Sequence, residues 1–169
     1  MKLQKVTRFL VLISLIGGLP LSAQQKKAPQ IRLEDPELYY AFFRAHVNVD
    51  LKIQSSAAAA AAQVSSSTAA VYRISPNDLP KLTDEIRKFN VSLGDWFSKE
   101  QYYLAQQRAA RKRPDIKVLV NYQWQRQRLV MNTHAAIHDA VTGSSWTGLN
   151  GYINGDFKTA QSQGKGAAK

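Results

Sequence analysis

The sequence predicts an all-α protein, an elongated antiparallel three-helix bundle with a short fourth helix at its C-terminal end. Apolar residues recur at three- and four-residue spacing along three long stretches. Turns rich in proline and helix-capping residues separate these stretches, and no stretch alternates apolar and polar residues as a strand would. Long amphipathic helices joined by short turns pack side by side in opposite directions.

The first helix is expected to begin at Asp35. Its side chain suits an N-cap, Pro36 suits the first helical position because no N–H is needed there, and Glu37 lies near the positive helix end. The helix then carries one apolar stripe, formed by Leu38, Phe42, Ala45, Val49 and Ile53.

The sequence leaves open how far this helix continues beyond Gln54. Six alanines at 57–62 favour helix, whereas the serines and threonine at 65–68 compete for backbone hydrogen bonds. We favour one helix that reaches about Tyr72 and frays at 65–68. The alternative is a low-complexity linker.

Two more long helices and a short one are expected after this stretch. Two prolines and several capping residues at 75–80 mark a turn, and the second helix should stop near Lys112 or Arg113 because Pro114 disfavours helix just before it. Asp115 then caps a third helix, which Gly143 would end in a left-handed conformation. A short helix should run from Ser144 to about 154–155.

The N-terminal segment is typical of a secretory signal peptide. Basic residues precede an apolar run, and small residues at 21–23 offer a cleavage site. The run is shorter than the ~20 residues that span a bilayer, and no later segment is long enough. We expect a periplasmic or extracellular protein with a signal peptide at 1–23, a flexible lead-in at 24–34, a helical bundle domain at 35–157 and a disordered tail at 158–169.

The composition excludes several classes of function. The absence of cysteine rules out a disulfide scaffold, a thiolate zinc site and a cysteine nucleophile. No nucleophile motif, glycine-rich phosphate loop or suitably spaced carboxylate pair is present, so the sequence predicts no catalytic residue and no cofactor. The net charge of +11 instead points to an anionic partner.

The first candidate site is a basic cluster around the turn between the second and third helices. Its members are Arg108, Arg111, Lys112, Arg113, Lys117 and Arg128. Such cations also suit a solvated helix end. The functional interpretation is contact with an anionic envelope surface or an acidic protein. Nucleic acid is disfavoured because no recognised binding motif is present.

The second candidate site is a set of polar residues within apolar stripes. Antiparallel packing places Glu100 and Arg126 at nearly the same level, where a carboxylate and a guanidinium compensate each other's charge. This predicts an interior ion pair that fixes helix register. The alternative is a polar chamber for a small ligand, which Asp50 and His46 would join if the first helix is unbroken.

The third candidate is the pair His134 and His138, whose i, i+4 spacing allows two imidazoles to share a metal ion. No acidic residue completes a zinc-protease motif, and ordinary boundary histidines are the alternative.

These observations favour an exported, non-enzymatic protein that binds anionic envelope components or client proteins. A ligand- or metal-binding bundle and a periplasmic holdase are the alternatives, and the oligomeric state stays open.

Overall fold

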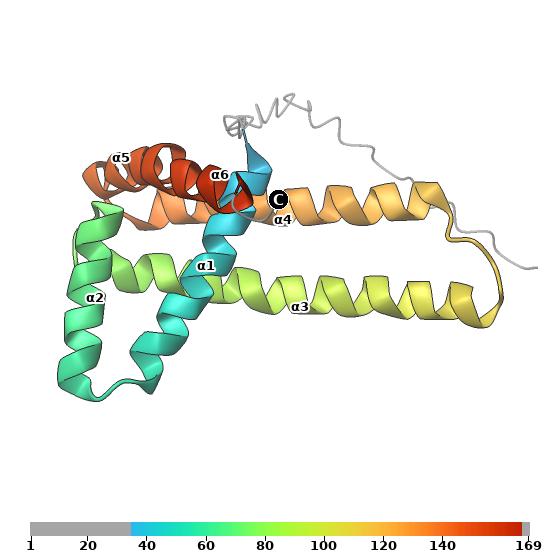
Figure 1. Ribbon diagram of the computed structural model, residues 1–169, viewed down its shortest axis with the longest axis horizontal. Helices are drawn as coiled ribbons and strands as arrows, with labels where there is room; N and C mark the ends of the chain where they lie inside the picture. Colours follow the sequence, from blue (N-terminus) through green and yellow to red (C-terminus); the bar gives the residue numbers. More distant parts are fainter. Residues whose placement is uncertain (1–34, 167–169) are drawn as a thin grey trace, which may run out of the picture. The chain divides into compact units, whose positions relative to one another are not determined.

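The computed structural model describes residues 35–166, with the side chains of 164–166 excepted. All regular structure within this range is helical (Figure 1), which confirms the all-α class. The elements are α1 Pro36–Ser55, α2 Ala58–Tyr72, α3 Leu79–Ala109, α4 Ile116–Ala140, α5 Gly143–Tyr152, a π-helical turn η1 Ile153–Phe157 and α6 Lys158–Gly166. The predicted signal peptide and lead-in lie outside the described residues.

The predicted first long helix is two helices. α1 ends at Ser55, the backbone is extended at Ser56 and Ala57 (ψ 151° and 153°), and α2 then runs back beside α1 (Figure 1). The hydroxyls of Ser55 and Ser56 donate to the carbonyl of Lys52 at 3.2 and 2.7 Å. They occupy an acceptor that helix propagation would use. The alanine run is helical, but the arrangement of three long helices is not confirmed.

Helix ends follow the capping residues closely at three of the predicted places. Asp35 accepts from the N–H of Leu38 at 3.1 Å, and Asp115 accepts from the N–H of Lys117 at 2.8 Å. α3 stops just before Arg111, which has a left-handed φ of 53°. The following residue, Lys112, donates its N–H to the carbonyl of Gln107 at 2.9 Å, completing a Schellman motif.

The C-terminal part differs from the prediction in two respects. Gly143 does not end α4 in a left-handed conformation; it is the first residue of α5, which Thr142 caps. Residues 158–166 form α6 rather than a disordered tail. The buried side chains of Ile153 and Phe157 fix the helical turn η1 against the core. Residues 158–166 extend that turn, so they do not bear the cost of starting a new helix.

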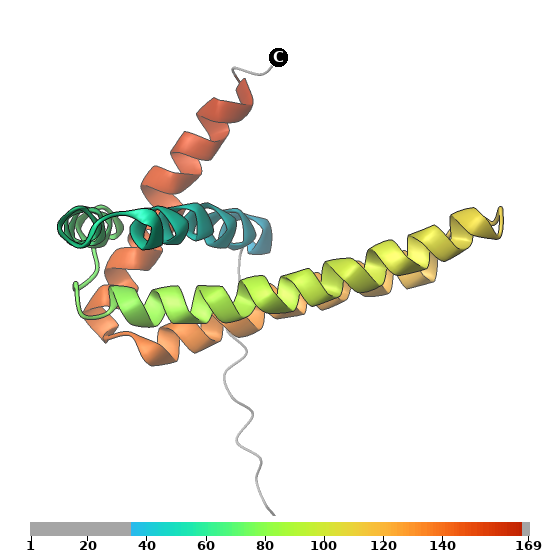
Figure 2. The ribbon, with the colours of Figure 1, turned by 90° about the horizontal axis from the view of Figure 1, so that it is seen from below.

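The core lies around α1, which packs against α2, α3, α4 and η1, with α5 closing the same end. Its fully buried large residues are Phe42, Phe43, Leu82, Ile86, Phe89, Val130, Ile137, Leu149 and Ile153. No residue from 94 to 129 is buried to this degree. In that segment α3 and α4 lie side by side and pack mainly on each other (Figures 1 and 2). We call residues 94–129 the arm.

α5 approaches the end of α2 closely at Gly148. A Cβ at this position would overlap the carbonyl of Arg73, the residue that ends α2 with a left-handed φ of 59°. We expect Gly148→Ala to lower the free energy of unfolding by about 2 kcal/mol, since the two helices must separate to admit the methyl group.

Gly94 provides the control, because a Cβ there meets no atom within 4 Å. Gly94→Ala should raise the free energy of unfolding by up to about 1 kcal/mol, the helix-propensity difference. Urea unfolding followed by circular dichroism measures both. Equal effects of the two substitutions would contradict the close approach at Gly148.

Candidate functional site

The two helices of the arm are held together by an aromatic seam. The indole of Trp96 donates to the carbonyl of Tyr122 at 3.0 Å, and the hydroxyl of Tyr122 donates to the carbonyl of Lys99 at 3.2 Å. The N–H of Asp115 donates to the hydroxyl of Tyr103 at 2.8 Å. These bonds tie side chains of one helix to the backbone of the other or of the connecting turn, so the hairpin has a defined register.

The basic cluster lies at the tip of the arm, with one exception. Five of its residues surround the turn between α3 and α4, and we call them the basic tip: Arg108, Arg111, Lys112, Arg113 and Lys117. The sixth, Arg128, lies on the same face as Lys117 but about three helical turns further along α4. All six side chains are exposed, and none forms a salt bridge with an acid of residues 35–166.

An exposed apolar stripe runs along α4 beside these cations. Ile116, Val120 and Trp124 are spaced four residues apart and therefore share a face. Their exposed fractions are 74%, 44% and 61%. The sequence prediction missed this stripe, although the four-residue spacing of its members could have revealed it. Large apolar side chains grouped in solvent are typical of interaction surfaces.

The predicted pairing of Glu100 with Arg126 is wrong. Arg126 instead donates to a carboxylate oxygen of Glu37 at 2.6 Å, and its guanidinium lies 5.1 Å from the ring centroid of Tyr40. Glu100 is half-buried and makes no hydrogen bond or salt bridge within the described part of the chain. The start of α1 packs against α4 near Arg126, and this packing places the carboxylate of Glu37 within reach of the guanidinium.

His46 and Asp50 do lie in one polar cluster, but without Glu100 and Arg126. His46 Nδ1 lies 3.2 Å from the hydroxyl of Tyr72, and Nε2 lies 3.0 Å from the hydroxyl of Thr83. The ring is fully buried, and burial lowers the pKa of His46 to about 4, with Arg87 acting in the same direction and Asp50 opposing. His46 is therefore neutral at pH 7 and links α1 to α2 and α3.

Asp50 completes this cluster through a two-pronged ion pair with Arg87. Nε and Nη2 of the guanidinium each donate to one carboxylate oxygen at 2.8 Å, and Gln54 donates to the same group at 2.8 Å. The Arg87 hydrogen bonds hold the pKa of Asp50 below its ordinary value. These hydrogen bonds tie α1 to α2 and α3. Asp50, Thr83 and Arg87 also line two neighbouring hollows of about 320 and 310 Å³.

His134 and His138 both pack against Trp146. Their ring centroids lie 4.7 and 5.0 Å from the indole, and the ring of Tyr39 packs against His134 from 4.8 Å. Burial is the main cause that lowers the pKa of His134 to about 4, whereas His138 is exposed and contacts Asp139 at 2.9 Å. Within residues 35–166, no three His, Cys, Asp or Glu side chains are placed to hold a metal ion. The i, i+4 spacing serves to clamp an indole.

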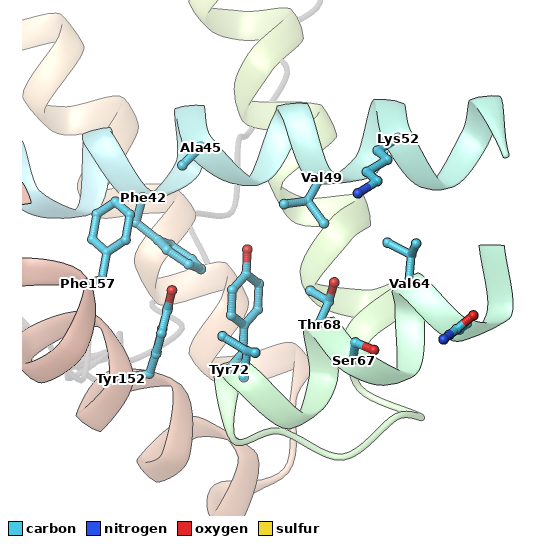
Figure 3. Close-up of a pocket in the computed structure, with 12 residues that line it drawn as sticks. Phe42, Ala45, Val49, Lys52, Val64, Ser67, Thr68, Tyr72, Tyr152 and Phe157 are labelled. Atoms are coloured by element: carbon cyan, nitrogen blue, oxygen red, sulfur yellow. The ribbon is translucent and has the colours of Figure 1, made fainter. Parts of the chain in front are cut away.

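A cavity of about 530 Å³ lies between α1 and α2 (Figure 3). Sequence reasoning missed it because it depends on the break after Ser55. Its walls are mostly apolar, and the only charged residue that lines it is Lys52. The lining residues are Phe42, Ala45, Val49, Lys52, Gln63, Val64, Ser67, Thr68, Val71, Tyr72, Tyr152 and Phe157.

Comparisons with known proteins give no further guidance. The chain matches no protein-family model, and neither the curated proteins nor the solved structures include a significant match. Among the described helices, none combines the length and the apolar character needed to cross a bilayer.

The buried histidines predict a loss of stability in acid. His46 has a pKa of about 4 in the folded protein against an ordinary value of 6.5, so between these pH values only the unfolded chain binds the proton. The free energy of unfolding should fall as pH decreases from 6.5 to 4, by on the order of 3 kcal/mol for His46 alone. His134 adds to the fall in the same direction.

Urea unfolding at a series of pH values measures this fall. The matched variant is His46→Gln, which should be less stable than the parent at pH 7 but lose less stability in the same pH window. An equally steep fall in the variant would mean that His46 is not the residue that titrates.

A double-mutant cycle tests the partner of Arg126. The Glu37–Arg126 pair is partly exposed, with side-chain exposures of 57% and 29%, so we expect a coupling energy of up to about 1 kcal/mol between Glu37→Gln and Arg126→Met. The cycle of Glu100→Gln with Arg126→Met should show no coupling. Unfolding free energies of the single and double variants provide both values, and a larger coupling to Glu100 would contradict the observed pairing.

Proposed function

We propose that this protein is an exported, non-enzymatic binding protein whose arm attaches to anionic lipid headgroups at a membrane surface of the cell envelope. The observation that carries the proposal is the basic tip, five exposed cations without acidic partners, placed directly beside the exposed apolar stripe of α4. The predicted signal peptide at 1–23 supports export, because it would deliver the chain to the envelope.

The charge of the arm favours an anionic partner. Residues 94–129 contain eight cations and three acids, and one of these acids, Asp115, already caps α4. Cations crowded at one turn repel each other within the ~8 Å over which salt screens charge. An anionic surface relieves that repulsion, and each Lys or Arg near such a surface contributes about 1 kcal/mol.

The conformation of Arg111 supports the same interpretation. Its φ of 53° lies in the left-handed region, where glycine is favoured and another residue costs roughly 1–2 kcal/mol. A cation therefore occupies a position at which a neutral glycine would stabilise the turn. Strained positions of this kind accumulate at functional sites.

The apolar stripe distinguishes a membrane from a purely polar polyanion. Ile116, Val120 and Trp124 offer side chains that can enter the headgroup region, where tryptophan is enriched. Lys117 and Arg128 flank the stripe and can direct their charged ends to phosphates while their stems stay against apolar material. A purely acidic protein surface would pair with the cations but would leave the apolar side chains of this stripe without contacts.

Vesicle co-sedimentation tests the proposal. We expect the protein to bind vesicles that contain phosphatidylglycerol, to release them as salt rises, and to ignore vesicles of phosphatidylcholine alone. Lys112→Glu/Arg113→Glu should weaken binding at least about tenfold, since two favourable contacts of about 1 kcal/mol become repulsive. Trp124→Ala should also weaken it.

Arg44→Glu/Lys158→Glu is the matched control, because it changes the net charge equally at exposed cations outside the arm. It should bind like the parent. Equal weakening by both double variants would reduce the effect to net charge and contradict a specific role of the basic tip. Binding only to an acidic protein, with no affinity for anionic vesicles, would overturn the lipid assignment.

A further inference from the structure

The cavity between α1 and α2 has the size and the closed end of a small-ligand site. Its volume of about 530 Å³ lies within the roughly 300–1,000 Å³ typical of such sites. Packed aromatic rings close one end: the ring centroid of Phe42 lies 5.2 Å from that of Tyr72 and 5.6 Å from that of Phe157. The rings of Tyr72 and Tyr152 lie 5.1 Å apart. This end is therefore a preformed apolar surface.

Beyond this end, apolar side chains line the cavity from both helices, beside the polar Gln63, Ser67 and Thr68 of α2. Ala45 and Val49 line the cavity from α1, and Val64 lines it from α2 (Figure 3). Val71 of α2 lines it as well. Val71 is 55% exposed although it faces this space, so part of its side chain lacks a packing partner in the described chain. Each methylene buried here contributes about 0.8 kcal/mol. The walls thus favour an alkyl chain.

Lys52 gives the cavity its charge. It is ten residues beyond Phe42 on α1, which separates the aromatic end from the lysine by about 15 Å along the helix axis. No acidic residue lines the cavity, and Lys52 forms no salt bridge with any of residues 35–166. Figure 3 shows its amino group on the side of α1 that faces α2.

Hydroxyl groups lie among the apolar side chains that line the cavity. Ser67 and Thr68 of α2 line the cavity near Val49, and Tyr152 carries its hydroxyl at the aromatic end. The hydroxyl of Tyr72 is engaged with His46 at 3.2 Å. The cavity therefore combines an apolar body with one unpaired cation and a few hydroxyl donors.

We infer that this cavity binds a free single-chain fatty carboxylate, with its alkyl chain toward Phe42 and Phe157 and its carboxylate at Lys52. The carboxylate supplies the negative charge that the cavity lacks, and the medium-length alkyl chain occupies the apolar walls. The cavity is lined by α1, α2 and the end of α5 with η1, whereas the arm belongs to α3 and α4. The inference thus does not depend on the proposed membrane contact.

The test measures binding of dodecanoate to the purified protein by isothermal titration calorimetry, below the micellar concentration. Dodecanoate should bind with one-to-one stoichiometry, and dodecyltrimethylammonium, which has the same chain with a positive headgroup, should bind at least about tenfold more weakly. Lys52→Gln should weaken dodecanoate binding about fivefold, the effect of one partly exposed ion pair. Lys99→Gln, the same change on the arm, should leave it unchanged.

A second pair of variants tests the location. Val64→Trp fills the cavity and should abolish dodecanoate binding, whereas Ala70→Trp, at an exposed position of α2 that does not line the cavity, should not. Far-ultraviolet circular dichroism checks that both variants stay helical. Equal affinity for the two surfactants, or unchanged binding in Val64→Trp, would overturn the inference.

Diacyl phosphatidylglycerol vesicles distinguish the two sites. Lys52→Gln and Val64→Trp should bind these vesicles like the parent protein, while Lys112→Glu/Arg113→Glu should still bind dodecanoate. If Val64→Trp lost vesicle binding and the tip variant lost dodecanoate binding, the cavity would not be an independent site and the inference would be overturned.

Discussion

The break after Ser55 is the constraint on which the rest of this structure depends. It limits α1 to 20 residues, or about 30 Å at the helical rise, whereas α3 has 31 residues and spans about 46 Å. A third helix of that length is not available to cover the full α3–α4 pair. The core therefore forms at one end of the pair, and residues 94–129 are left to pack mainly on each other.

The same break places the end of α2 against the middle of α1. Tyr72 reaches His46 because α2 returns alongside α1, and Thr83 of α3 holds the other ring nitrogen. A neutral, fully buried imidazole with both nitrogens in hydrogen bonds is a specific connection, since leaving either one unpaired costs about 1–3 kcal/mol. One helical turn further along the same face of α1, the Asp50–Arg87 pair also ties α1 to α3. These contacts determine where α1 lies on the long helix pair.

Two regions keep cations and apolar side chains without a packing or charge partner in the described chain, and the two regions differ in chemistry. The arm has exposed cations beside an apolar stripe, which suits an extended surface of negative charge with apolar depth. The cavity has a single cation at one end of a mostly apolar groove that is partly open to solvent, which suits one small amphipathic anion. The arm is exposed because no third helix packs along the whole of α3 and α4. The cavity forms because the alanine-rich α2 leaves space between itself and α1.

The sequence alone determined the helical class, the caps at Asp35 and Asp115 and the end of α3 near Pro114, because periodicity and capping are local properties. It also located the basic tip, because those residues are adjacent in the chain. Tertiary structure decided what depends on distant segments: the partner of Arg126, the contacts of His46, the helical state of 158–166 and the cavity itself. Glu37 displaced Glu100 as the partner because the position of α1 on α4, 89 residues away in sequence, follows from core packing and not from local spacing.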